Sequence, residues 1–395
     1  MTLKITKNTQ QLREKLTQVE KPSGIAGEAM LRANTVRDQA NLLGYAPDNI
    51  IINGDMKIAQ RGTSTTTADG FLADRFKTTN GTGGNITTTQ ESDGPHTKDG
   101  HFKYYTQLNV TQADTSLAST EWGGVFYIIE GNDWDWFNYG TANAETATLS
   151  FWHCHNVAGT YCVTLRNQGG GSNRNYVVEY TQDIADEWQK TVIVFPGDFS
   201  GTWTTGTGGA VSILFTYANG SSYHADSVTE TNKWFGGTYY HSTENQVNLM
   251  SAANNKFRLT GVQIVRGNHP DGLPFQFRHY SEELVRCQRY YQTYQFTAQT
   301  FVYIEGSIST YRWIHVPGWS KTNMRTTPTV TLPSVPSNSA INGFGTNYVS
   351  SIATGGISEE ALSIRVTTQT SGGNSFELRH WDGLSGSKIQ FNAEI

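Results

Sequence analysis

The sequence predicts a mainly β protein: an antiparallel jelly-roll β-sandwich with a short helical N-terminal segment and a small C-terminal β domain. Its 395 residues are enough for more than one domain. With 40 Gly, 12% aromatic and only 16% charged residues, the composition is typical of short strands joined by turns. Strand-length apolar segments follow one another without intervening helical patterns, which favours antiparallel pairing.

Residues 1–49 differ from the rest. Leu12, Leu16 and Val19 recur at helical spacing, and a second helical run spans about residues 25–43. Two short helices with thin apolar stripes cannot form a core of their own. The segment is therefore either a lead-in packed on the main domain or a docking segment for a partner or for copies of the same chain.

Residues 50–278 are predicted to form the jelly roll. About ten strand-length segments, bounded by Gly, Asn, Asp and Ser, occur in roughly 230 residues. Their irregular spacing argues against a β-helix or a propeller. The segments are NGDMKIAQRG, ADRFK, HFKYYTQLNV, GGVFYIIE, TATLSFWHCH, YCVTLRN, NYVVEYT, WQKTVIVF, AVSILFTY and FRLTGVQIV.

A connecting helix is predicted over residues 279–292. Ser281 is a plausible N-cap with acidic residues in the first turn, and Cys287 lies on the apolar stripe, facing a core. Strand patterns resume over residues 293–395, enough for a second, smaller β domain.

Charge and cysteine content exclude several function classes. The net charge is −5 and the basic residues are scattered, so a nucleic-acid partner is not expected. Cys154, Cys162 and Cys287 are an odd number without metal-type spacing, and we interpret them as buried thiols. No signal-type or membrane-length apolar run is found, so we expect synthesis in a cytoplasm and no membrane insertion.

The segment EGNDWDWFNYG, residues 130–140, concentrates carboxylates and aromatic rings. If it is extended, Asp133 and Asp135 share one face while Trp134 and Trp136 share the other. A glycosidase acid pair would need one carboxyl group in a desolvating site. Nothing in this polar loop predicts one, so no catalytic residue is assigned. A sugar-stacking platform and a rim loop that packs on the sandwich or on a neighbouring subunit remain as alternatives.

Long loops elsewhere carry further aromatic residues among Asn, Ser and His, a combination used by recognition surfaces but also by subunit interfaces. The candidate glycan-binding residues are Trp134, Trp136, Trp203, Trp234, Tyr239 and Tyr240.

The segment FWHCH places His153 and His155 on one face of a regular strand. Two such histidines can share a metal, but a third ligand at suitable spacing is not visible. We therefore predict neither a metal nor a cofactor.

Several motifs occur in a fixed order along the chain: INGDMKIAQRGTS, ADRF, GGVFYIIEGND, ATLSFWHCHNVAGTYCVTLRN, WQKTVIVFPGDFSGTW, FRLTGVQIVRGN and LPFQFRHYSEELVRCQRYYQ. On these motifs together, the chain from residue 50 to about 332 resembles the carbohydrate-binding-module-like jelly roll of many bacteriophage and prophage tail-fibre or virion appendage proteins. The closing segments MRTTPTVTL and IQFNAEI resemble the C-terminal region of the same proteins.

The resemblance implies a non-enzymatic phage virion protein, a tail-fibre, spike or head-fibre subunit that is assembled in the host cytoplasm. Such subunits are usually trimers. Residues 1–50 would contact other virion proteins, and the β-rich part would bind host surface polysaccharide during adsorption. A structural capsid or tail decoration protein without glycan binding, and a polysaccharide-degrading spike, are the alternative functions.

Overall fold

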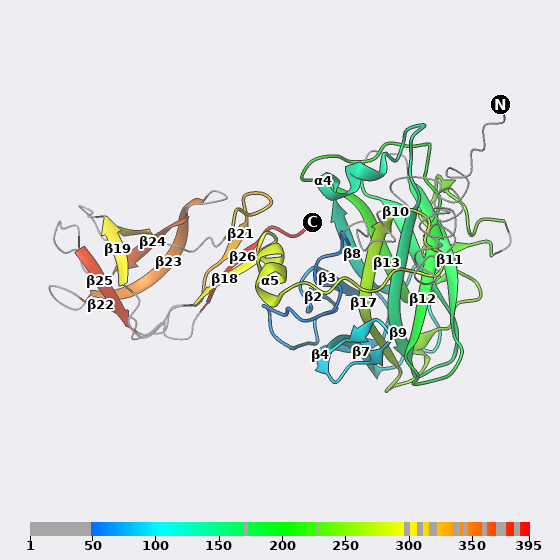
Figure 1. Ribbon diagram of the computed structural model, residues 1–395. Coiled ribbons are helices and arrows are strands. Elements are labelled where there is room, and N and C mark those ends of the chain that lie inside the picture. The colour runs from blue at the N-terminus through cyan, green and yellow to red at the C-terminus, as the bar shows by residue number, and fades with distance from the viewer. Residues whose placement is uncertain are drawn as a thin grey trace, which may run out of the picture.

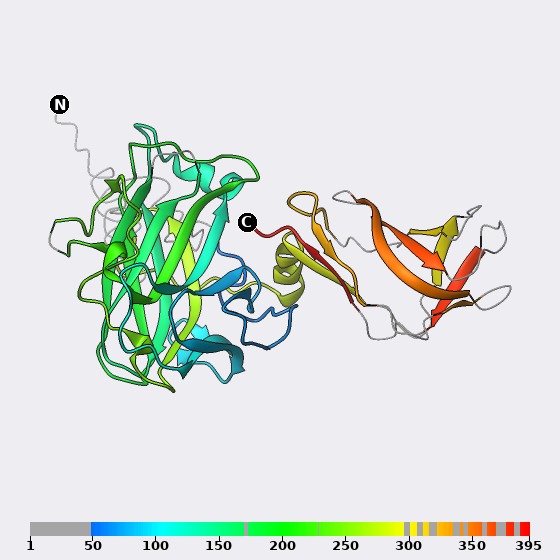
Figure 2. The same cartoon turned by 180° about the vertical axis from the view of Figure 1, so that it is seen from behind.

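Figures 1 and 2 show a computed structural model of the chain from two opposite sides. It describes residues 49–169, 173–227 and 229–295 without interruption. Beyond these it describes the segments 301–305, 311–315, 322–334, 340–342, 347–357, 362–368, 377–382 and 388–395. The predicted N-terminal helical segment, except Asn49, lies outside the described residues.

Two antiparallel sheets form the sandwich. The six-stranded sheet has the order β1 (Ser64–Thr65), β4 (Asn85–Ser92), β7 (Tyr104–Gln112), β17 (Lys256–Arg266), β9 (Ala147–His155) and β12 (Gln189–Phe195). The seven-stranded sheet has the order β15 (Phe235–Gly236), β11 (Arg174–Gln182), β10 (Gly159–Asn167), β13 (Gly209–Asn219), β8 (Trp122–Glu130), β3 (Phe76–Asn80) and β2 (Asp69–Phe71). The chain crosses repeatedly between the sheets, which confirms the predicted antiparallel jelly roll.

The core lies between the sheets and follows the two-residue period of the strands. In β8, Val125, Tyr127 and Ile129 are buried in the core. Phe126 and Ile128 alternate with them and are only partly buried, on the outer face of the seven-stranded sheet. The alternation that fills the core therefore also determines which side chains the outer face presents.

Short elements join and cover the sheets. The segment between β13 and β17 runs over the outer face of the seven-stranded sheet, where Thr164 Oγ1 donates to the carbonyl of His241 over 3.0 Å. The short elements are β5 (His96–Thr97), β6 (Gly100–His101), α4 (Gly131–Trp134), η1 (Asp135–Phe137), η2 (Ser221–Tyr223), β14 (His224–Ala225), β16 (Ser242–Thr243) and η3 (Leu249–Ser251).

The C-terminal part is a smaller β unit, as predicted. Helix α5 (Tyr280–Gln288) leads into a three-stranded sheet of β18 (Tyr291–Gln295), β26 (Lys388–Asn392) and β21 (Thr329–Thr331). In Figure 1 a closed barrel lies at the far end of this unit. Its strands, in order, are β19 (Phe301–Glu305), β20 (Tyr311–His315), β24 (Leu362–Thr368), β23 (Asn347–Ile357), β22 (Ala340–Asn342) and β25 (Glu377–Asp382).

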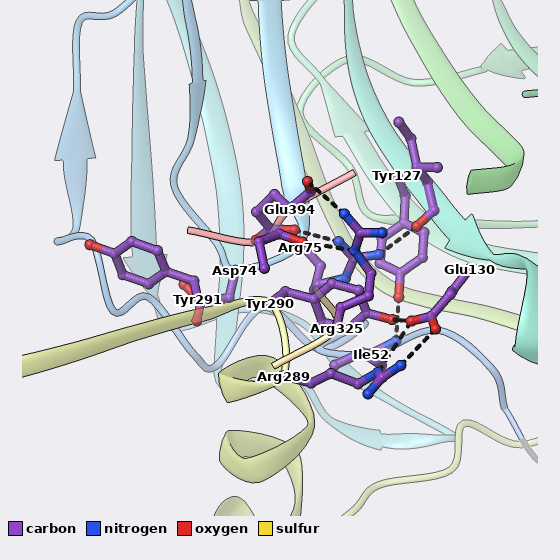
Figure 3. Close-up of polar contacts among 12 residues, drawn as sticks. Ile52, Asp74, Arg75, Tyr127, Glu130, Arg289, Tyr290, Tyr291, Arg325 and Glu394 are labelled. Atoms are coloured by element: carbon purple, nitrogen blue, oxygen red, sulfur yellow. Dashed lines mark hydrogen bonds and ion pairs between the residues drawn. The ribbon is translucent and has the colours of Figure 1, made fainter. Parts of the chain in front are cut away.

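Buried ion pairs join the C-terminal unit to the sandwich (Figure 3). Arg75 pairs with Glu394, which follows β26. Arg289 Nη2 donates to Glu130 Oε1 over 2.7 Å, and the Tyr290 hydroxyl donates to Glu130 Oε2 over 2.7 Å. The Arg75–Glu394 pair thus holds the last residues of the chain against the sandwich, and the bonds to Glu130 hold the residues that follow α5. Removing one partner of either pair would leave a buried charge uncompensated.

Two local predictions are wrong. The segment NGDMKIAQRG, residues 53–62, is predicted as a strand but forms a turn and an irregular stretch, with Asn53 at φ 61° and Met56 at φ 57°. The Asn53 amide bridges this turn, since its Oδ1 accepts from the Ile58 N–H and its Nδ2 donates to the carbonyls of Ile58 and Asp74. The connecting helix begins at Tyr280 with His279 as its N-cap, not Ser281.

Candidate functional site

Residues 131–137 of the segment 130–140 are helical, so the alternation expected of an extended strand does not occur. Residues 131–134 form α4 and residues 135–137 form η1. Trp134 is 2% exposed, whereas Trp136 is 68% exposed. The helical turns therefore place the two tryptophans in opposite environments.

Trp134 belongs to an aromatic group at one end of the sandwich, here called the end cluster: Trp134, Phe137, Tyr139, Trp203 and Trp234. The rings of Trp134 and Phe137 stack with centroids 4.2 Å apart. Tyr139 meets Trp203 and Trp234 edge to face, at 4.9 and 5.6 Å. The indole N–H groups of Trp203 and Trp234 donate to the carbonyls of Ser200 and Pro196. These rings bury one another and so close the core.

The carboxylates of this segment differ in pKa. Burial opposes ionisation of Glu130, but hydrogen bonds from Arg289 and Tyr290 outweigh it and hold its pKa below the usual value. Burial and the charge of Glu130 raise the pKa of Asp133. Divergent pKa values are typical of an acid–base pair, but Glu130 is 1% exposed and bound to the C-terminal unit. Glu130 and Asp133 therefore lie where the sandwich meets the C-terminal unit, and not in an open cleft.

His153 and His155 both lie in the interior. His153 Nδ1 donates to Gln182 Oε1 over 3.0 Å, and its Nε2 contacts Thr191 Oγ1 at 2.9 Å. Burial lowers the pKa of His153 to about 4, so it is neutral at pH 7. Within the described segments, no group of three or more His, Cys, Asp or Glu is placed to hold a metal ion. The three cysteines are buried free thiols.

The described helices include none with the length and apolarity needed to cross a bilayer.

A recess of about 120 Å³ opens on the outer face of the seven-stranded sheet. Its lining combines aromatic and aliphatic side chains with cations and an amide, contributed by β2, β3, β8, β10 and the chain end. We call it the outer-face recess; it is lined by Phe71, Arg75, Lys77, Phe126, Ile128, Arg166, Gln168 and Ile395.

A hydroxyl organises the polar side of this recess. Ser212 Oγ, on β13, accepts from Arg166 Nε over 3.1 Å and from Gln168 Nε2 over 2.9 Å. Arg166 Nη1 donates to His241 Nε2 over 3.3 Å. Burial and the nearby Arg166 lower the pKa of His241 to about 3, so this imidazole is neutral and can accept the bond. The guanidinium is thus held in one orientation.

Aromatic rings flank the same guanidinium. The Arg166 Cζ atom lies 4.8 Å from the ring centroid of Tyr239 and 5.7 Å from that of Phe126. The Tyr239 hydroxyl donates to the carbonyl of Asn167 over 3.2 Å, which fixes this ring beside β10. Rigid aromatic faces beside oriented donors are the features with which proteins bind sugar-like ligands.

The structure separates the six candidate glycan-binding residues. Trp134, Trp203 and Trp234 belong to the end cluster, and Trp136 is exposed beside it. Tyr239 contacts Arg166, one of the residues that line the outer-face recess. Tyr240 packs against Phe235 at 5.5 Å and against the small cluster of Cys162, Val177 and Ala225.

Sequence reasoning missed Phe126, Arg166 and Gln168, because they lie on or beside strands rather than on aromatic loops. One signal was available. In YCVTLRN, an arginine occurs two residues after Thr164, on the face opposite to Val163 and Leu165. A cation on the outer face of an otherwise apolar strand indicates that this face is a candidate binding surface.

No family model matches the sequence, and no curated protein matches it. Among solved structures, it is similar to the enzymatically active domain of tailspike protein 4 of bacteriophage CBA120, with 13% identity, TM-score 0.31 and coverage of 55% of this chain and 21% of that one. The family 11 carbohydrate-binding module of the Clostridium thermocellum cellulase Lic26A-Cel5E has 18% identity, TM-score 0.29 and coverage of 52% and 96%.

A putative sugar-binding protein from Bacteroides thetaiotaomicron has 9% identity, TM-score 0.29 and coverage of 55% of this chain and 100% of that one. Because all three TM-scores are below 0.5, no ligand or activity is transferred from these proteins. The fold assignment rests on the strand order and register of this chain itself.

Proposed function

We propose that this protein is a non-enzymatic phage virion subunit, a tail fibre, spike or head fibre, that binds bacterial surface polysaccharide through the outer-face recess. The observation that carries the glycan-binding part is the recess itself, where Phe126 and the oriented polar groups of Arg166 and Gln168 line one hollow and Tyr239 flanks Arg166. The virion part is supported by the ordered sequence motifs that resemble phage appendage proteins.

The size of the recess defines what it holds. Pockets that enclose a whole small molecule have volumes of about 300–1,000 Å³, and this one has about 120 Å³. It accommodates one sugar unit or its substituent, while the rest of a polysaccharide lies along the sheet. Single-site affinity is then weak, and a trimeric appendage would strengthen attachment through avidity.

The test is binding of fluorescently labelled full-length protein to an array of purified bacterial surface polysaccharides. We expect saturable binding to a subset, reduced by Tyr239→Ala and unchanged by Trp136→Ala, which removes an exposed ring outside the recess. If the folded protein binds no polysaccharide, or if Trp136→Ala abolishes binding and Tyr239→Ala does not, this assignment is wrong. Mass spectrometry of purified virions tests the virion part separately.

A polysaccharide-degrading spike is the second candidate, because Asp133 has a raised pKa beside Glu130. Glu130 is inaccessible, and its carboxylate oxygens are engaged by Arg289, Tyr290 and Asn132. We therefore expect no release of reducing sugars from any bound polysaccharide. Release that disappears in Asp133→Asn would favour the enzyme.

A decoration protein without glycan binding is the third candidate. Its test is adsorption of virions that lack the protein, which would then equal that of complete virions.

A further inference from the structure

The outer-face recess holds a cation whose charge no neighbouring side chain balances. Arg166 lies on β10 with its side chain on the outer face, opposite Ser212 of β13. Its hydrogen-bond partners are a hydroxyl and a neutral imidazole, and its ring neighbours are Phe126 and Tyr239. In the part of the chain that the structure describes, no carboxylate pairs with it.

Other cations at the recess are neutralised. Lys77 pairs with Asp69 at 3.0 Å, and Arg75 pairs with Glu394. Outside the recess, carboxylates likewise pair with Arg258, Arg278 and Arg289. Arg166 therefore differs from these cations: it is partly buried and held by hydrogen bonds to Ser212 and His241, yet it brings an uncompensated positive charge to the recess.

Burying a guanidinium costs free energy unless an anion pairs with it. Burial lowers the pKa of Arg166, as expected of a cation removed from water without an anion. A neutral side chain that bonded Ser212 and His241 would stabilise the fold as well as Arg166 does. A ligand anion would restore the charge balance, and a guanidinium fork matches the planar oxygens of a carboxylate or the oxygens of a phosphate.

We propose that the outer-face recess selects an anionic polysaccharide, and that Arg166 binds its carboxylate or phosphate group. This proposal rests on the glycan-binding function proposed above. The aromatic rings of Phe126 and Tyr239 lie beside the guanidinium. They exclude water from the ion pair and strengthen it. Gln168, bonded to the same Ser212 hydroxyl, is placed to contact neighbouring sugar hydroxyls.

The experiment compares chemically matched ligands on the polysaccharide array. Each acidic polysaccharide is printed in its native form, after carbodiimide-mediated reduction of its carboxylates to alcohols, and after hydrofluoric acid removal of its phosphates. The full-length protein should bind native acidic polysaccharides and lose at least tenfold in affinity on one of the two treatments. The treatment that abolishes binding identifies the anion as carboxylate or phosphate.

Variants of the cation complete the test. Arg166→Gln should lose roughly ten- to a hundredfold in affinity, as expected for a charged hydrogen bond, and Arg166→Lys should retain part of it because the charge remains without the fork. Arg286→Gln, which removes the same charge from the exposed face of α5, is the matched control and should bind normally. Thermal unfolding confirms that each variant is folded.

The outcomes separate this inference from the function on which it rests. If the protein binds neutral and acidic polysaccharides alike, or if folded Arg166→Gln binds as tightly as the wild type, selection of an anion is refuted and glycan binding stands. If the wild type binds nothing on the array, both proposals are refuted.

Discussion

Two aromatic regions of this molecule have similar composition but opposite construction. In the end cluster, Trp134, Phe137 and Tyr139 pack on one another, and Trp134 is 2% exposed. In the outer-face recess, Phe126 remains partly exposed and flanks a guanidinium, as does Tyr239. In the end cluster the rings are covered by one another, whereas the recess leaves ring surface and the charge of Arg166 accessible to a ligand. An aromatic-rich sequence is therefore no guide to binding until the partners of its rings are known.

The largest effect that separates the two regions is expected from Trp134→Ala. Removing this indole leaves a cavity against Phe137 and Tyr139, and a fully buried Trp-to-Ala change costs about 3–5 kcal/mol in free energy of unfolding. Chemical denaturation measures the loss. The folded fraction should bind polysaccharide with unchanged affinity, and a selective loss of binding would place the end cluster in the site.

The next effect concerns pH. The folded-state pKa of His241 is about 3 and that of His153 about 4. Both are below the ordinary histidine pKa of about 6.5. The stability that each neutral histidine contributes is therefore complete above about pH 6.5, and it is lost as the pH falls from there toward the folded-state pKa. Burial raises the pKa of Asp74 to about 6, so this carboxyl acts in the opposite direction between about pH 4 and 6.

His241→Gln isolates one of these contributions, since glutamine can still accept from Arg166. Between pH 7 and 5, the wild type should lose about 2 kcal/mol more in free energy of unfolding than this variant. The measurement is urea denaturation at both pH values. Trp134→Ala provides the contrast, because its ring neighbours do not titrate there and its penalty should be equal at the two pH values.

A smaller effect is expected from Phe126→Ala. This ring lines the recess and meets Trp122 edge to face at 5.3 Å, but it is not part of the core. The variant should lose about five- to tenfold in polysaccharide affinity, since an aromatic contact contributes ~1 kcal/mol. Titration of bound polysaccharide measures this. Affinity equal to that of the wild type, in a folded variant, would remove Phe126 from the site.

The smallest effect is expected from Trp136→Ala. The side chain is 68% exposed, and the contact that Arg266 makes to this residue is to its backbone carbonyl, which alanine retains. The free energy of unfolding should change by less than about 0.5 kcal/mol. Polysaccharide affinity should also be unchanged. A clear loss of affinity would support the alternative that residues 130–140 form a sugar-stacking platform.

The fold class was predictable because strand periodicity is a local property. Val125, Tyr127 and Ile129 alternate with Phe126 and Ile128 in the sequence as they do in the sheet. The turn around Asn53 was not predictable from periodicity. Its apolar residues resemble a strand, but the Asn53 side chain bonds the backbone of Ile58 within the turn and that of Asp74, which becomes a neighbour only after folding. The segment 130–140 was mispredicted because its turns are helical, so that Trp134 stacks on Phe137 within the same segment, and Tyr139 of this group meets Trp203 and Trp234 from distant loops.

The sequence by itself determined the β-sandwich, the C-terminal β unit and the burial of Cys287, because composition, period and turn residues act over a few positions at a time. Only the tertiary structure decided which aromatic residues face a ligand and which charge is left unbalanced. Arg166, Ser212 and His241 are far apart in sequence and meet only when β10 pairs with β13 and the long loop crosses the sheet. Such a constellation depends on which distant strands pair and on where the long loop crosses them, and neither is visible in the pattern of any one segment.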